Sequence, residues 1–207
     1  DRVFLPYDPK MALDKYSVSF WIYPERNISD SWTGLFGRAG RNYAIWLGNS
    51  NHVSSPFIHH RYAEGANTNQ GPGNHYLPGW NQWYHVVCTN GGTGSVARTF
   101  VNGSYLEGNA VREIQVVENL PVNTSAPLNI GVNPEAAGSN GQHFQGRMDD
   151  VRLYGIALGI EDVQLIYKGE AHMSSLQNTA LHGTVFKATT PILPAFADLN
   201  ITYGQKI

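Results

Sequence analysis

Residues 99–106 read TFVNGSYL, the clearest local structural signal in the chain. Asn102 and Gly103 stand between two apolar runs, and an Asn-Gly pair supplies the two positive-φ residues that a type I′ turn requires. The stretch therefore predicts a tight antiparallel hairpin, with strands expected on both sides of it.

In several other segments, every second residue belongs to one set of side chains and the residues between them to another set. In a β-strand these two sets point to opposite faces. Residues 17–23 (SVSFWIY), 42–47 (NYAIWL) and 83–89 (WYHVVCT) carry large side chains in both sets. They are expected to be inner strands of a packed sandwich. Further strands are predicted at residues 3–5, 35–38, 57–62, 114–117, 128–131 and 144–154.

One segment does not show this two-residue alternation. Residues 159–169 read GIEDVQLIYKG, with apolar residues at helical spacing, two acidic residues in the first turn and a glycine placed to end the helix. The predicted fold class is therefore all-β, a two-sheet antiparallel sandwich of jelly-roll type, with one short helix near residues 160–168 at its edge.

Composition agrees with this fold class and excludes some functions. The 207 residues include 22 glycines and 11 prolines, as expected for short strands joined by many turns. A net charge of -2, with 14% charged residues, provides no basic surface for a phosphate backbone, so no nucleic-acid partner is expected. No apolar run approaches the roughly 20 residues that cross a bilayer, so we expect no direct membrane insertion.

The single cysteine, Cys88, lies in an apolar run and is expected to be a core residue. Four Asn-x-Ser/Thr triplets begin at Asn27, Asn102, Asn123 and Asn200. Each is a potential glycosylation site in a secreted eukaryotic protein, although some such triplets arise by chance in a chain this rich in asparagine.

The order of motifs along the chain resembles a known family. The motifs are SVSFWIYP (17–24), LFGR (35–38), NQWYHVVCTN (81–90), FVNGSYLEG (100–108), PLNIG (127–131) and FQGRMDDVRLYGIALGIEDVQLIYKG (144–169). Together they resemble the laminin-G-like jelly-roll family of the concanavalin A-like lectin/glucanase superfamily. The resemblance implies two antiparallel sheets packed face to face, in a superfamily that includes lectins, pentraxins and some polysaccharide-degrading enzymes.

The resemblance also suggests a division of the chain. Residues 1–170 are expected to form the jelly-roll domain, and residues 171–207 a C-terminal extension that docks on the same domain or on a neighbour. The extension contains strand-like pieces at 184–187 and 199–203.

Catalysis is not expected, because retaining glycoside hydrolysis needs two carboxylates about 5–5.5 Å apart. Glu113 and Glu118 are an odd number of residues apart, so a regular strand would place them on opposite faces. The Gln-Ile-His motif of alginate-lyase relatives is also missing. We therefore expect a protein that is not an enzyme.

The sequence contains two candidate metal sites. His59 and His60 are adjacent, so a strand would direct them to opposite sides, and they are expected to be hydrogen-bonding residues and not zinc ligands. Alternation through residues 148–154 places Asp149 on the same side as Val151 and Leu153, which should face the core. Asp149 then either ties down a neighbouring loop by hydrogen bonds or binds calcium, the one cofactor that the sequence suggests.

A binding site is expected around the polar stretch from His59 to Trp80, which combines aromatic residues with Asn, His and Arg. Aromatic rings stack on sugar faces, and the polar side chains hydrogen-bond hydroxyl groups. The predicted ligand-binding residues are Trp32, Arg38, His60, Arg61, Tyr62, Asn74, Tyr76 and Trp80, and Asn67 and Asn69 lie in the same stretch.

These observations favour a non-catalytic, lectin-like module that binds a glycan or polysaccharide, in a secreted or cell-surface protein. Two alternatives remain. One is a domain for protein interaction, assembly or adhesion, with another subunit bound through the C-terminal extension. The other is a polysaccharide-active enzyme of the same fold.

Overall fold

The computed structural model describes residues 2–25, 32–40, 42–48, 55–62, 71–117, 126–133 and 142–169. The extension 171–207 lies outside the described residues, as do Asn67, Asn69 and the triplets at Asn27, Asn123 and Asn200. None of the described helices has the length and apolar character that a bilayer crossing requires.

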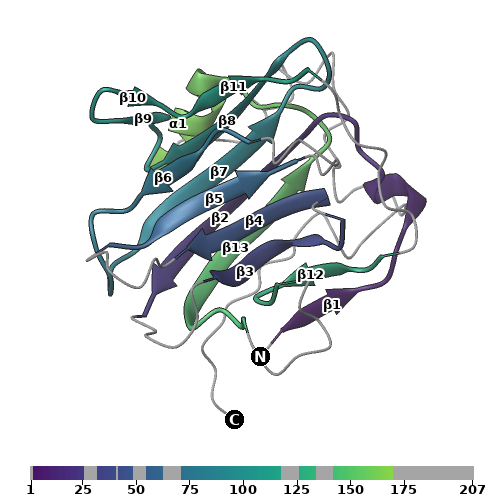
Figure 1. Ribbon diagram of the computed structural model, residues 1–207, viewed down its shortest axis with the longest axis horizontal. Helices are drawn as coiled ribbons and strands as arrows, with labels where there is room; N and C mark the ends of the chain where they lie inside the picture. The colour runs from purple at the N-terminus through teal and green to yellow at the C-terminus, as the bar shows by residue number, and fades with distance from the viewer. Residues whose placement is uncertain are drawn as a thin grey trace.

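Two antiparallel sheets lie one over the other, as the sequence predicts (Figure 1). The six-stranded sheet, here sheet A, has the order β1 (Val3–Leu5), β12 (Leu128–Ile130), β3 (Trp32–Arg38), β4 (Asn42–Gly48), β5 (Phe57–Arg61) and β6 (Asn74–Tyr76). The five-stranded sheet, sheet B, has the order β11 (Glu113–Gln115), β8 (Val96–Val101), β7 (Tyr84–Asn90), β2 (Tyr16–Pro24) and β13 (Gly146–Tyr154). A short 3-10 helix, Pro9–Met11, follows β1.

The core forms between the sheets from alternate residues of each strand. In β2, Val18, Phe20 and Ile22 are fully buried and face sheet A, whereas Trp21 and Tyr23 are only partly buried. Burying an aliphatic or phenyl side chain of this size contributes about 1.5–3 kcal/mol. The alternation therefore leaves each sheet with an outer face that the core does not use.

The predicted helix is confirmed as α1, Ile160–Lys168. The Asp162 carboxylate accepts a hydrogen bond from the Gly159 backbone N–H (3.1 Å), and Gly169 ends the helix with φ of 70°. Buried side chains of α1, among them Val163 and Ile166, pack on Phe100 of β8. The helix therefore covers one half of the outer face of sheet B (Figure 1).

The predicted hairpin turn is present, with positive φ at Asn102 (50°) and Gly103 (79°). Val101 and Ser104 exchange both backbone hydrogen bonds, at 2.8 and 3.1 Å. The chain then leaves β8 and forms a small separate hairpin of β9 (Leu106–Glu107) and β10 (Ala110–Val111).

The expectation that Asp149 shares a side with Val151 and Leu153 is wrong. The pairing of β13 with β2 shifts register between Asp149 and Arg152, and Asp150 has a φ of 50°. A bulge of this kind inserts one residue and reverses the alternation beyond it. Val151 consequently packs in the core, while Asp149 pairs with Trp21 on the outer face of sheet B.

Candidate functional site

The outer face of sheet A is built by the same alternation that builds the core. In β5, Ile58 and His60 face the interior and are fully buried, whereas Phe57, His59 and Arg61 point to the outer face. The prediction that adjacent histidines diverge is confirmed: the two rings lie on opposite sides of sheet A.

Five rings from four strands gather on this outer face. They form the sheet A aromatic cluster: Trp32, Trp46, Phe57, His59 and Tyr76. The His59 ring is the centre, with its centroid 4.8 Å from that of Trp32 and 5.6 Å from that of Trp46, on which it stacks. Phe57 joins Trp32 (5.5 Å) to Tyr76 (5.2 Å). The rings therefore form one continuous surface across the strands.

The accessible part of the cluster lies at its two ends. Tyr76 is 38% exposed and Trp32 is half-buried, whereas Trp46, Phe57 and His59 are buried. The inner rings thus fix the positions of the two outer ones, which are available to a ligand.

A glycine creates the space that one ring occupies. A Cβ on Gly48 would lie 2.1 Å from an atom of the Phe57 ring, and Gly48 is the cross-strand partner of both Phe57 and Trp32. The Phe57 ring therefore lies over the backbone of β4, where any side chain would displace it.

Neutral amides line the cluster. Nδ1 of His59 donates to Oδ1 of Asn74 (2.6 Å), and the indole N–H of Trp46 donates to Oδ1 of Asn133 (3.1 Å). The amide of Asn133 in turn donates to Oε1 of Gln142. These groups hold the rings in place and give the surface polar atoms without adding net charge.

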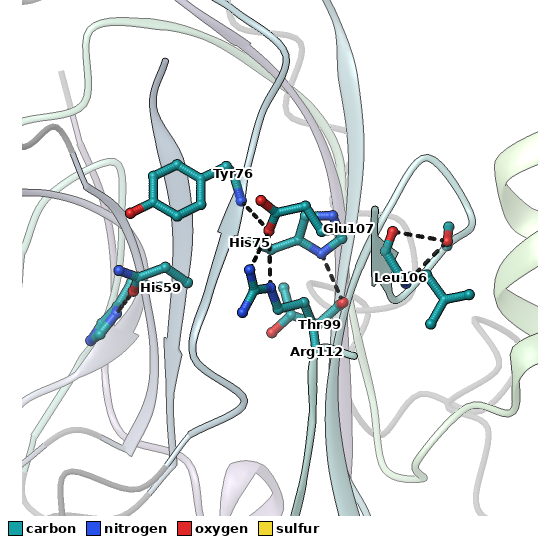
Figure 2. A network of polar contacts seen from close by, with 9 residues as sticks. His59, His75, Tyr76, Thr99, Leu106, Glu107 and Arg112 are labelled. Atoms are coloured by element: carbon teal, nitrogen blue, oxygen red, sulfur yellow. Dashed lines mark hydrogen bonds and ion pairs between the residues drawn. The ribbon is translucent and has the colours of Figure 1, made fainter. Parts of the chain in front are cut away.

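A charged pair anchors the exposed end of the cluster. Figure 2 shows the Glu107 carboxylate between Tyr76 and Arg112. One carboxylate oxygen accepts from the backbone N–H of Tyr76 (2.9 Å) and from Nε (2.9 Å) and Nη2 (2.7 Å) of Arg112. On the other side of β6, Nδ1 of His75 donates to the carbonyl of Thr99 in sheet B (3.2 Å). The short strand β6 is therefore held from both sides.

The structure brings four of the eight predicted ligand-binding residues to this face. They are Trp32, Arg61, Asn74 and Tyr76. Trp80 is half-buried and packs against the core. The outer-face residues Trp46, Phe57, His59 and Asn133 are absent from the prediction. Alternation in residues 57–62 puts Phe57 and His59 on one face, but Trp46 joins them only through the pairing of β4 with β5.

The other three predicted residues, Arg38, His60 and Tyr62, lie in the interior. Tyr62 is part of the core, and Nε2 of His60 is hydrogen-bonded to the Tyr16 hydroxyl (3.0 Å). Burial, followed by the charges of His59 and Arg61, lowers the pKa of His60 to about 3, so the ring is neutral. These three side chains are buried and are not part of the sheet A aromatic cluster.

The guanidinium of Arg38 is also fully buried. It lies over the rings of Tyr7 and Tyr43, at 5.3 and 5.6 Å from their centroids. Burial lowers the pKa of Arg38 below its usual value.

The Asp149 carboxylate is hydrogen-bonded: Oδ1 accepts from the backbone N–H of Asp150 (2.8 Å). Among the residues that the structure describes, no group of three His, Cys, Asp or Glu side chains could hold a metal ion. Asp149 therefore has no clustered partner for calcium within the described part of the chain.

Comparison with solved structures shows the same fold at low identity. A heptameric SAP-like pentraxin from Limulus polyphemus is 17% identical with a TM-score of 0.55, over 80% of this chain and 74% of that one. A putative carbohydrate binding protein from Bacteroides ovatus is 14% identical with a TM-score of 0.55, over 79% of this chain and 44% of that one. Domain 4 of an extracellular arabinanase from Geobacillus stearothermophilus, in complex with arabinotriose, is 20% identical with a TM-score of 0.52, over 79% of this chain and 70% of that one.

Sequence comparison identifies the family. No protein of curated function matches the chain. The laminin-G-like family model of the concanavalin A-like lectin/glucanases superfamily matches residues 1–164, which include every strand described above. The chain therefore belongs to the concanavalin A-like lectin/glucanases superfamily, as a member of its laminin-G-like family.

Proposed function

We propose that this protein is a non-catalytic glycan-binding module of a secreted or cell-surface protein, and that it binds through the sheet A aromatic cluster. The observation that carries the proposal is the placement of Trp32 and Tyr76 as accessible rings at the two ends of a rigid aromatic surface.

The chemistry of the cluster fits a sugar. The C–H faces of a pyranose or furanose ring are apolar and pack on aromatic faces, while the hydroxyl groups need donors and acceptors nearby. The Asn74 amide, whose Oδ1 accepts from His59, lies on the edge strand β6, and Arg61 lies on the same face two residues beyond His59 on β5. A ligand gains about 25 cal/mol for each Å² of apolar surface that it removes from water.

The arrangement of carboxylates supports a binding role without catalysis. Glu107 accepts hydrogen bonds from Arg112 and Glu113 from Arg98, so each is already engaged by a guanidinium. Glycoside hydrolysis needs one carboxylate to act as an acid and the other as a base or nucleophile, and each of these two would first have to leave its arginine partner to reach a sugar.

The similar structures are consistent with this proposal. The arabinanase domain was crystallised with arabinotriose, and the Bacteroides ovatus protein is described as a putative carbohydrate binding protein. At 14% and 20% identity these proteins share the fold with this chain, so the ligand of this chain has to be found by experiment.

Titration with defined sugars tests the proposal. Arabinotriose, cellotriose and laminaritriose are suitable soluble probes, and a glycan array extends the range. We expect Trp32→Ala and Tyr76→Ala each to weaken binding at least tenfold, which is about 1.4 kcal/mol. Trp32→Phe, which keeps a ring, should retain part of the affinity, and Val117→Ala, at a 71% exposed position outside the cluster, should leave it unchanged.

Binding to none of these glycans by a folded protein would refute the proposal. It would then favour an interaction or assembly domain, which sedimentation would reveal as a stable oligomer.

A further inference from the structure

The outer face of sheet B carries a second group of aromatic residues, on the half that α1 leaves uncovered. Trp21 and Tyr23 of β2 point to this face, and Trp83 lies immediately before β7. The centroids of the Tyr23 and Trp83 rings are 5.7 Å apart, with 61° between their planes. Trp83 is 42% exposed, so a large indole surface is presented to solvent.

The exposed aromatic rings on this face are not part of the core between the sheets. The core between the sheets takes the inward residues Ile22 and Tyr84, and α1 packs on residues of the other half, such as Phe100. Tyr167, at the end of α1, is 36% exposed and packs on Trp21, with 6.0 Å between ring centroids. The aromatic surface therefore continues from Trp83 to the edge of α1 without a described element covering it.

Two charged groups lie beside Tyr23, on the side of that ring away from Trp83. The Arg147 guanidinium lies 5.0 Å from the centroid of the Tyr23 ring, and its Nη2 is 3.9 Å from a carboxylate oxygen of Glu25. Both side chains are about half exposed, at 56% and 50%. At this distance and exposure the two groups attract each other weakly, so each can hydrogen-bond a ligand at little cost.

An apolar protein partner fits this surface poorly, because it would remove both charges from water without giving them partners. A sugar fits better, since its C–H face can pack on Trp83 while neighbouring hydroxyls accept from Arg147 and donate to Glu25. The charges of Arg147 and Glu25 are opposite, and the Asp149 carboxylate lies on the same outer face, so the surface has no net attraction for an anionic sugar.

We propose that Trp83, Tyr23, Arg147 and Glu25 form a second glycan-binding site, on the sheet opposite the first, that selects neutral sugars with adjacent free hydroxyl groups. The site shares the ligand class of the proposed function but none of its residues, and the two can fail independently.

The indole N–H signals of the protein provide the test, because the chain has only five tryptophans and each gives one signal in a two-dimensional ¹⁵N spectrum. The probes are arabinotriose and cellotriose as neutral sugars, and trigalacturonate as the anionic counterpart. Substitution of single tryptophans by phenylalanine assigns the signals. The titration is repeated in Tyr76→Ala, which impairs the sheet A surface only.

We expect a neutral trisaccharide to shift the Trp83 signal. The sugar concentration at the midpoint of this shift should be unchanged in Tyr76→Ala. Arg147→Met should weaken binding at this site, so that the midpoint sugar concentration rises about tenfold. Phe4→Ala, which removes a 54% exposed ring from β1 of sheet A, should not change it. Trigalacturonate should bind no more tightly than the neutral sugars.

Three results would overturn the second site. The Trp83 signal could stay fixed in all three sugars, its shift could disappear in Tyr76→Ala, or it could depend on protein concentration without sugar, which would indicate contact between two copies. If the Trp83 signal shifts and the Trp32 signal does not, the second site stands and the sheet A proposal fails.

Discussion

Replacing His60 or His85 with glutamine is expected to remove a large part of the protein's sensitivity to acid. Both imidazoles are buried. His60 lies between the sheets against the Tyr16 hydroxyl, and His85 lies on the outer face of sheet B, beside Tyr167 of α1 and against the Ser19 hydroxyl, each hydrogen bond being 3.0 Å long. Burial lowers the pKa of His60 to about 3, and burial together with the charge of Arg152 lowers the pKa of His85 to about 4.

The sign of the effect follows from proton linkage. In the unfolded chain both histidines titrate near pH 6.5, so below that pH the unfolded state binds protons that the folded state does not. The stability that depends on neutral His60 and His85 is complete above pH 6.5. It is lost as the pH falls from 6.5 toward 4 and 3, the folded pKa values of His85 and His60.

The magnitude at pH 5 can be worked from these values. Each pH unit below 6.5 costs about 1.4 kcal/mol per histidine, so 1.5 units cost about 2 kcal/mol each and about 4 kcal/mol for the pair. This is a large fraction of the 5–15 kcal/mol that holds a typical domain folded. Burial also lowers the pKa of His75, which acts in the same direction.

Urea unfolding followed by tryptophan fluorescence, at several pH values between 7.5 and 5, measures the effect. In His60→Gln and in His85→Gln, the free energy of unfolding should fall by about 2 kcal/mol less over this range than in the parent protein. Comparing each variant with itself at pH 7.5 removes the cost of the substitution. A parent protein whose stability is flat between pH 7 and 5, or variants with the parent's slope, would refute the assignment of these histidines as buried and neutral.

Other consequences of the structure can be checked directly. Gly48→Ala places a Cβ 2.1 Å from the Phe57 ring, so it should lower the free energy of unfolding by about 1–3 kcal/mol in urea and weaken sugar binding as well. Burial raises the pKa of the Cys88 thiol well above its usual value, so DTNB should label Cys88 only at urea concentrations that unfold the protein, and labelling of the folded protein would contradict its burial. Glu107→Ala leaves the Tyr76 backbone N–H without its acceptor, so amide exchange at Tyr76 should accelerate; an unchanged rate would show that Glu107 does not hold β6.

Most of the fold could be predicted from alternation and turn chemistry. The apolar pattern located the long strands to within one to three residues, and the acidic first turn and final glycine located α1. Strand β6 was missed because Asn74, His75 and Tyr76 carry no apolar alternation. It is held by pairing with β5 and by Glu107, contacts between segments that the sequence does not place together.

The site is harder to predict, because nearness in the chain does not show which face of a sheet two residues share. His60 and Tyr62 are neighbours of Arg61 in sequence, yet they point into the core. Asp149 was placed on the wrong face because the bulge depends on a positive φ at Asp150, a conformation that an aspartate pattern does not predict.

If glycans bind on the two outer faces as proposed, instead of on the loops alone, the protein would act on a polymer in a particular way. The sheets of a sandwich pack about 10 Å apart, so rings on the two outer faces point in opposite directions from opposite sides of the domain. A single short oligosaccharide cannot contact Trp32 and Trp83 together, and each would bind its own ligand with its own affinity. Two polysaccharide chains could instead bind at once, one on each sheet. The gain in avidity would then come from cross-linking two chains and not from binding one chain more tightly.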